Sequence, residues 1–239
     1  GGRTIIAHVD LRVGAGEIVG LIGSNGAGKT TFMNAVGGFV PARGRVLLDG
    51  EDLSDLDAVG RARRGLGRSF QSALLYPRLS VRECIQVALE AHRRTEVLPS
   101  LLAFPPAVRA ERWSRARAEE ILGLFNLGER ADQPAGELST GTRRVVELAC
   151  LIALRPRVVL LDEPMAGIAQ RESEAMAPLL LEVRRELGAS MLVIEHDLPM
   201  VTAISDRMYC FDQGQVLAEG TPAEVQRDPR VVASYLGTD

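Results

Sequence analysis

Residues 23–30 read Gly-Ser-Asn-Gly-Ala-Gly-Lys-Thr, the most specific pattern in the chain. It fits the pattern G-x-x-x-x-G-K-[ST], follows an apolar run at residues 17–22, and precedes a helical pattern at residues 30–36. In such a turn the glycines let successive backbone N–H groups point at phosphate oxygens, and the N-terminus of the helix reinforces the attraction. A chance match is the alternative, and the strand before and helix after argue against it. The stretch therefore predicts a phosphate-binding loop.

Within this loop, the Lys29 ammonium is expected to reach the β- and γ-phosphates of a nucleotide. The Thr30 hydroxyl is expected to bind Mg²⁺, so ATP and Mg²⁺ are the expected cofactors. The residues expected around the phosphates are Ser24, Asn25, Gly26, Ala27, Gly28, Lys29, Thr30 and Thr31.

Two carboxylates follow a second apolar run, Val158–Leu161. A buried parallel strand delivers Asp162 and Glu163 to the carboxyl edge of its sheet, where ligands bind. Asp162 would then hold Mg²⁺ and Glu163 would act as general base on the attacking water. The alternative is an acidic N-cap of the next helix, helped by Pro164. The phosphate loop favours the catalytic interpretation.

The rest of the chain alternates strand and helix patterns, which predicts a largely parallel sheet. Strands are expected at residues 4–13, 17–22, 45–50, 157–161 and 190–194, with a closing hairpin at 207–219 that turns at Gln213-Gly214. Helices are expected at residues 30–36, 139–154 and 171–187, and in a helical insert at 81–125 that is broken at 99–106.

Composition bounds the class of protein. With 239 residues, 46% hydrophobic and 25% charged, the chain suits one large α/β domain. A net charge of −3 and only 4% aromatic residues argue against a nucleic-acid partner. Cys84, Cys150 and Cys210 are far apart in apolar sequence, which predicts buried thiols. No run approaches the length of a membrane-spanning helix, and we expect no signal peptide.

Three further motifs stand in a fixed order with the first two. They are Arg68-Ser69-Phe70-Gln71, Leu138-Ser139-Thr140-Gly141-Thr142 and Ile194-Glu195-His196-Asp197. The set resembles the ATP-binding cassette (ABC) ATPase family. The resemblance implies that Gln71 senses Mg²⁺ and the γ-phosphate and that His196 positions the attacking water. It also implies that Ser139 and Gly141 cradle the ATP bound by the opposite subunit, although an ordinary serine N-cap is the alternative for Ser139.

The resemblance covers nearly the whole chain and implies a single ABC ATPase domain over residues 1–239. Its expected fold is a RecA-like α/β core with an antiparallel β-subdomain and a helical subdomain at residues 72–155. Expected partners are a second ATPase subunit, identical or paralogous, and transmembrane permease subunits, at the cytoplasmic face of the inner or plasma membrane. The implied catalytic residues are Glu163 and His196, and the implied metal ligands are Thr30, Gln71 and Asp162.

The tail at residues 219–222 and 228–237, the insert near residues 92–118, and residues 163–167 are similar to the branch that imports branched-chain amino acids and amides. A lipid or lipopolysaccharide exporter, a soluble ABC ATPase and a module that binds ATP without hydrolysing it are the alternatives. The chain departs from the family at Thr140 and Thr142, at Ala169 in place of an acidic or amide residue, and at residues 1–4, which contain no adenine-stacking aromatic.

Overall fold

The computed structural model describes residues 5–69, 75–90, 105–167 and 170–236. The chain divides into two compact units. The first comprises residues 1–71, 156–166 and 174–239, and the second comprises residues 72–155 and 167–173.

A six-stranded sheet organises the first unit, in the order β4-β5-β6-β1-β7-β8. Its neighbouring strands run parallel except β7 and β8, which form an antiparallel hairpin. The strands are β1 (Ile18–Gly23), β4 (Leu66–Arg68), β5 (Val158–Asp162), β6 (Ser190–Ile194), β7 (Arg207–Asp212) and β8 (Gln215–Gly220). The helices that accompany them are α1 (Lys29–Val36), α2 (Ala58–Arg63), α7 (Gln170–Leu187), α8 (Leu198–Ile204), α9 (Pro222–Arg227) and α10 (Pro229–Leu236).

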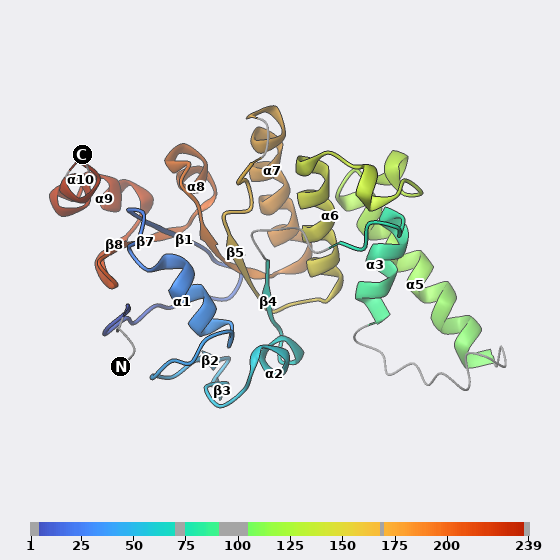
Figure 1. Cartoon of the computed structure of the whole chain (residues 1–239), viewed down its shortest axis with the longest axis horizontal. Coiled ribbons are helices and arrows are strands. Elements are labelled where there is room, and N and C mark those ends of the chain that lie inside the picture. The colour runs from blue at the N-terminus through green and yellow to red at the C-terminus, as the bar shows by residue number, and fades with distance from the viewer. Residues whose placement is uncertain (1–4, 70–74, 91–104, 168–169, 237–239) are drawn as a thin grey trace. The chain divides into compact units, whose positions relative to one another are not determined.

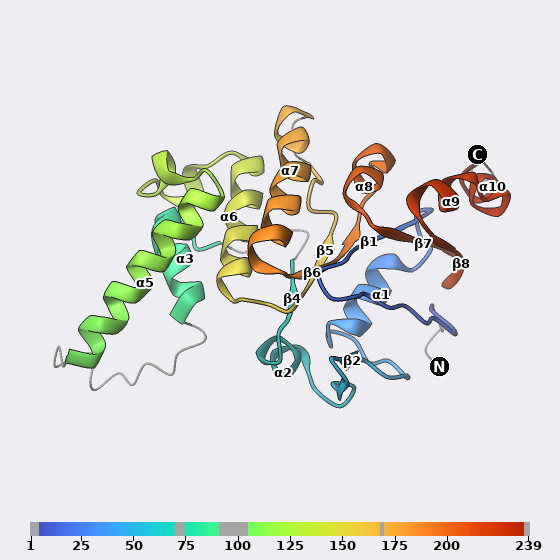
Figure 2. The ribbon, with the colours of Figure 1, turned by 180° about the vertical axis from the view of Figure 1, so that it is seen from behind.

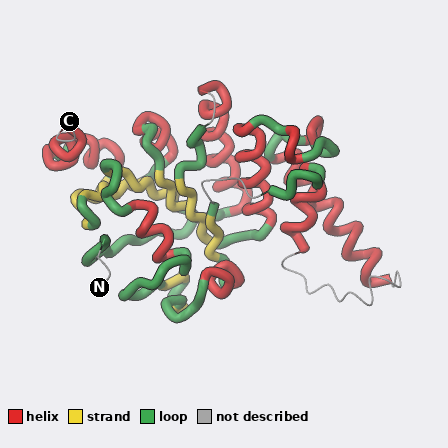
Figure 3. The backbone as a smooth tube through the Cα atoms, in the orientation of Figure 1, coloured by secondary structure: helices red, strands yellow, loops and turns green. Residues whose placement is uncertain are grey.

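Helices cover both faces of this sheet. Figures 1 and 2 show α1 on one face and α8 on the other, and Figure 3 shows the strands as one continuous band between them. Every residue of β1 and β6 is buried, as expected for the centre of a covered parallel sheet. On the α1 side, the rings of Phe32 and Phe211 meet edge to face at 5.3 Å. The carboxyl ends of β1, β5 and β6 therefore share one edge of the sheet.

Most predicted elements of the first unit are confirmed. The strands at residues 17–22, 157–161 and 190–194, the helices at 30–36 and 171–187, and the hairpin turning at Gln213-Gly214 all form within a residue or two of the prediction. The strand expected at residues 45–50 is instead a short hairpin of β2 (Leu47–Leu48) and β3 (Glu51–Asp52) around a turn at Asp49-Gly50. Both turn residues have positive φ, which suits a tight hairpin.

The edge strand predicted at residues 4–13 is wrong for the part that is described, residues 5–13, which form no strand. The alternation has a different cause, because Val9, Leu11 and Val13 pack against the core from an irregular segment. Isolated hydrogen bonds hold this segment in place: the Ala7 N–H donates to the Gly214 carbonyl, and the Arg12 N–H donates to the Tyr209 hydroxyl. Alternation of apolar and polar residues indicates that one side of the segment is buried. A strand also needs a neighbouring strand with which to form a ladder of hydrogen bonds.

The second unit is helical in its described residues. Its long helices α3 (Val81–Glu90), α5 (Pro105–Leu124) and α6 (Thr140–Ala153) contact one another, and two short 3₁₀ turns lie at Gly128–Arg130 and Ala135–Glu137. The helical insert and the helix at 139–154 are thus confirmed where they are described, although α5 begins at Pro105, inside the expected break. Proline is tolerated in a first turn because the N–H that it lacks has no helical partner there. Among the described helices, none has the length and apolar character needed to span a membrane.

Candidate active site

The predicted phosphate loop, residues 23–30, runs from the last residue of β1 into the first turn of α1 (Figure 1). Gly23 must be glycine, because it has a φ of 146° and an added Cβ would lie 2.2 Å from the Phe211 carbonyl oxygen. Gly28 caps α1 in the left-handed conformation, and no described side chain caps this helix. The first N–H groups of α1 are therefore available to an anion. Loop and helix together form a nest that fits a chain of phosphates.

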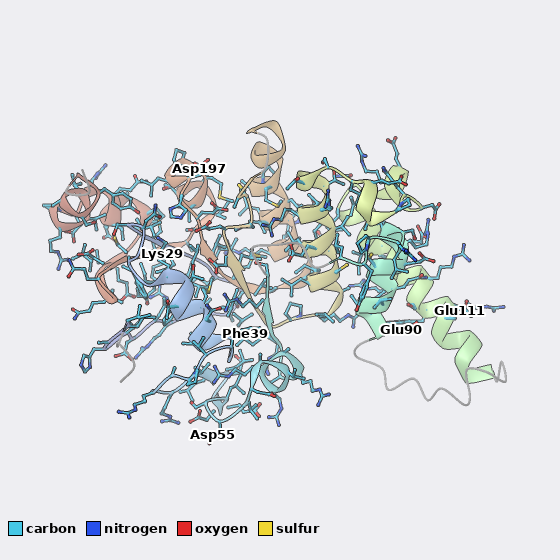
Figure 4. The ribbon with its side chains drawn as sticks, in the orientation of Figure 1. Lys29, Phe39, Asp55, Glu90, Glu111 and Asp197 are labelled. Atoms are coloured by element: carbon cyan, nitrogen blue, oxygen red, sulfur yellow. The ribbon has the colours of Figure 1, made fainter. Side chains whose placement is uncertain are left out.

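Lys29 lies folded over this loop, at the start of α1 (Figure 4). Its Nζ donates to the carbonyl oxygens of Gly23 at 2.6 Å and Ser24 at 3.1 Å, and the residue is only 6% exposed. Burial lowers the pKa of Lys29, and the negative charge of Glu163 acts in the opposite direction. Among the described residues, only these two neutral carbonyls accept hydrogen bonds from the ammonium, which can exchange them for phosphate oxygens.

Asp162 ends β5 beside the loop, as predicted. The Thr30 hydroxyl donates to its Oδ1 at 3.4 Å, and Nη2 of Arg68 donates to its Oδ2 at 3.2 Å. Burial raises the pKa of Asp162, and the charge of Arg68 opposes the shift. Since Arg68 occupies one carboxylate oxygen, the other oxygen is the one that faces Thr30.

Thr30 Oγ1 and Asp162 Oδ1 fit Mg²⁺, which prefers a few oxygen ligands from the protein and completes its shell with water and substrate phosphates. No cluster of three or more His, Cys, Asp and Glu side chains occurs in the part of the chain that is described. The Thr30 hydroxyl and the Asp162 carboxylate suit a metal that takes the rest of its ligands from water and from the nucleotide. Gln71, the third expected ligand, lies outside the described residues.

Glu163 and His196 meet at the same edge of the sheet. Oε1 of Glu163 lies 2.8 Å from Nε2 of His196, and the Glu163 N–H donates to the Ile194 carbonyl. Glu163 has a φ of 50°, a left-handed conformation that is uncommon outside glycine and clusters at functional sites. The sequence predicted both residues as catalytic, and the structure brings them together.

Glu195 holds this pair in place, a role that sequence reasoning missed. Its buried carboxylate accepts hydrogen bonds from the backbone N–H groups of Met165 at 2.9 Å and His196 at 3.2 Å. The Glu195 side chain thereby connects the turn after Glu163 to the loop that begins at His196, after β6. Burial raises the pKa of Glu195, and the two N–H donors oppose the shift. The signal in the sequence was an acid directly after an apolar run, Met191–Ile194, the same signal that identified Asp162.

Arg68 is a second residue whose role was missed. It forms a buried ion pair with Asp162 and stacks on Phe39, whose ring centroid lies 5.1 Å away. Its Nε and Nη1 are buried and have no hydrogen-bond partner among the described residues. Arg68 is the last residue of β4, and no sequence pattern around it predicts a role. Only the pairing of β4 with β5 places it beside Asp162.

The remaining predicted residues belong to the second unit or are not described. Ser139 is the N-cap of α6, where its hydroxyl accepts from the Thr142 N–H at 3.1 Å, and Gly141 is buried in the first turn. The ordinary N-cap interpretation therefore holds for Ser139, and it is compatible with a phosphate cradle because both use the helix N-terminus. Ala169 and residues 1–4 lie outside the described residues. Cys84, Cys150 and Cys210 are free thiols; Cys84 and Cys210 are buried as predicted, whereas Cys150 is partly exposed.

Comparison with known proteins places the chain among ATP-binding cassette proteins. The family model described as "ABC transporter" matches residues 6–166, and a model described as "Branched-chain amino acid ATP-binding cassette transporter" matches residues 215–239. The chain is 38% identical to the high-affinity branched-chain amino acid transport ATP-binding protein BraF of Pseudomonas aeruginosa, over 99% of this chain and 93% of that protein. It is 37% identical to LivG of Escherichia coli K12, with the same coverage. It is 36% identical to the lipopolysaccharide export system ATP-binding protein LptB of Escherichia coli K12, over 100% and 93%.

Solved structures resemble the chain along almost its whole length. A nucleotide-free ATP-binding cassette from an ABC transporter aligns with a TM-score of 0.81 at 30% identity, covering 97% of this chain and 92% of that one. A dimeric post-hydrolysis state of the ATP-binding cassette MJ0796, bound to ADP and Pi, aligns with a TM-score of 0.75 at 26% identity, covering 91% and 90%.

Proposed function

Because this chain belongs to the ABC transporter family and is an ATP hydrolase of that family, we propose that it powers the import of branched-chain amino acids or related small polar solutes. The observation that carries the proposal is the meeting of Lys29, Asp162 and the Glu163–His196 pair at one edge of the sheet. The class of transported solute is inferred from relatives that are named for branched-chain amino acid transport and are similar over 99% of this chain.

ATP would bind with its phosphates along residues 24–31. The Lys29 ammonium would leave the carbonyls of Gly23 and Ser24 for the β- and γ-phosphates, where it neutralises charge. The backbone N–H groups of the loop and of the first turn of α1 would hold the remaining oxygens. The phosphate oxygens would thus replace the two carbonyls as acceptors for the buried Lys29 ammonium and would add opposite charge.

Hydrolysis would use the carboxylate of Glu163 as general base. A water held between Glu163 and the γ-phosphate would lose its proton to Oε1, and His196, 2.8 Å from the same atom, would fix the carboxylate's orientation. Glu195 would keep both residues aligned through the backbone of Met165 and His196. The strained backbone at Glu163 fits a side chain that must point at substrate rather than at the core.

Thr30 and Asp162 would hold Mg²⁺ through Oγ1 and Oδ1 respectively, and Gln71 is the proposed third ligand. When bound, the metal would screen the charge of the phosphates. Arg68 would keep the Asp162 carboxylate turned toward Thr30 by holding its second oxygen.

A complete site would require a second cassette. Ser139 and Gly141, at the N-terminus of α6, would face the nucleotide bound by the opposite subunit, which is either another copy or a paralogue. The similarity to MJ0796, a cassette whose structure bound to ADP and Pi is dimeric, supports the need for a second cassette. Permease subunits would anchor the pair at the cytoplasmic face of the inner or plasma membrane.

Import is favoured over export by one observation. Residues 215–239 match a family model described for branched-chain amino acid cassettes, and this segment includes β8, α9 and α10. The similarity to LptB, at 36% identity, keeps lipopolysaccharide export as the second candidate. The two candidates differ in cargo and direction, so a transport measurement separates them.

The test is uptake of radiolabelled leucine, isoleucine and valine by the chain's own host after deletion of its gene. The wild-type chain should restore uptake, and Lys29→Ala should restore none, because the variant loses the charge that faces the phosphates. Arg185→Ala is the control, since Arg185 is exposed and pairs only with Glu182 and Glu186 in the same helix among the described residues.

Unchanged uptake of all three amino acids in the deletion strain would refute the proposed cargo. Loss of lipopolysaccharide from the cell surface in the same strain would favour the export candidate instead. Full rescue by Lys29→Ala would refute the assignment of the phosphate loop.

A further inference from the structure

The first residue of the phosphate loop, Gly23, is held through both its N–H group and its carbonyl group. The Gly23 N–H donates to the hydroxyl of Tyr235 at 2.9 Å, across 212 residues of sequence. The Gly23 carbonyl accepts from Nζ of Lys29 at 2.6 Å. Tyr235 thus contacts the loop at the point where β1 ends, and it does so from α10, the last helix of the chain.

The C-terminal segment is built to hold Tyr235 there. Thr221 and Glu224 form a capping box at the start of α9, and Val225 is buried beneath it. Asp228 accepts two hydrogen bonds from the Arg230 side chain and one from its N–H, which fixes the start of α10. α10 contacts β1 and β8 as well as α9. The tyrosine is therefore presented by an ordered element.

A second observation places the end of α10 beside the phosphate loop. The Ser234 hydroxyl, next to Tyr235, donates to the Val231 carbonyl within α10 at 2.8 Å. Ser234 and Ala233 also line one hollow of about 290 Å³ together with the outer side of the loop. The other lining residues are Ser24, Asn25, Gly26, Ala27, Asp212 and Gln213.

We propose that Tyr235 is a positioning residue of the nucleotide site, and that its hydrogen bond to Gly23 sets the shape of the phosphate loop and hence its affinity for nucleotide. The inference rests on the proposed function of that loop. When the Lys29 ammonium turns to the phosphates, the Gly23 carbonyl loses this donor, while the hydrogen bond from the Gly23 N–H to Tyr235 is kept. Tyr235 touches no reacting atom, so its effect falls on binding rather than on turnover.

The first measurement is affinity for ATP and for ADP by calorimetric titration of the Tyr235→Phe variant, which keeps the ring and removes only the hydroxyl. The loss of one hydrogen bond should weaken both nucleotides about fivefold and leave kcat at saturating ATP within about twofold. Tyr209→Phe is the matched control. Its hydroxyl donates a hydrogen bond to Glu219 and accepts from the Arg207 side chain and the Arg12 N–H, away from the loop.

The second measurement needs no nucleotide. Lys29 is the only lysine in the chain, so an amine-reactive reagent followed by peptide mapping reports on this one side chain. If Tyr235 holds the loop closed around Lys29, Tyr235→Phe should raise the rate of Lys29 modification about fivefold, and Tyr209→Phe should leave it unchanged.

The proposal is overturned if Tyr235→Phe matches the parent in both measurements, or if Tyr209→Phe changes both as much, because general loosening would then explain the effect. A merely structural role would lower the unfolding temperature and leave affinity and Lys29 reactivity alone, which also overturns it. If the parent binds no ATP while Tyr235→Phe still exposes Lys29, the proposed function fails and the positioning of the loop by Tyr235 stands.

Discussion

Replacing Arg68 by methionine tests the buried ion pair behind the phosphate loop. Arg68 and Asp162 have side chains only 7% and 2% exposed, and their charged atoms lie 3.2 Å apart. At an effective dielectric constant of about 20, two unit charges at this distance attract by about 5 kcal/mol. Methionine has a similar length and no charge, so Asp162 would be left buried with only the Thr30 hydroxyl as a side-chain donor among the described residues. We expect a loss of about 3–5 kcal/mol in the free energy of unfolding at pH 7.

The loss should depend on pH in a defined direction. Burial already raises the pKa of Asp162, and removing Arg68 takes away the charge that opposes this shift. A carboxyl whose pKa is higher in the folded than in the unfolded chain favours the folded state when it is protonated. The deficit of the variant relative to the parent should therefore be full at pH 7 and shrink as the pH falls toward about 4.

The assay is urea unfolding of parent and variants followed by circular dichroism, without nucleotide or Mg²⁺, from pH 7 down to pH 4.5. Adding Asp162→Asn to Arg68→Met should recover most of the loss, because the unpaired charge is then gone. Arg64→Met is the control, since Arg64 pairs with Glu51 at the surface and should cost less than about 1 kcal/mol. A deficit below about 1 kcal/mol at pH 7, or one that does not change with pH, would refute the reasoning.

Two further predictions concern the reaction itself. Glu163→Gln should retain ATP binding but reduce the rate of phosphate release about 100-fold or more, because the amide still hydrogen-bonds His196 but cannot take a proton from water. If the variant releases phosphate at the parent's rate, another residue is the base. The isolated chain should show a specific ATPase activity that falls on dilution, because the proposed site needs Ser139 and Gly141 of a second subunit; constant activity across a wide dilution series would argue against a composite site.

The local chemistry of the fold was predictable from the sequence. The apolar run before Gly23, the glycines of the loop and the helical pattern after Lys29 each dictate their own conformation, and β1, the loop and α1 form as expected. The positive φ angles of Gln213 and Gly214 likewise follow from a two-residue turn between alternating strands. Residues 5–13 show the limit, because alternation indicated a buried side but could not show whether a partner strand was present.

The predicted site residues followed the same division. Lys29, Asp162 and Glu163 were found because each stands at a strand end or a helix start within a short, recognisable pattern. Arg68 and Tyr235 were not given roles, because each acts through a partner distant in sequence, 94 and 212 residues away. Sequence alone thus determined which groups could carry phosphate chemistry. Only the tertiary structure decided what holds them, because pairing β4 with β5 and docking α10 against β1 are long-range events that no local pattern encodes.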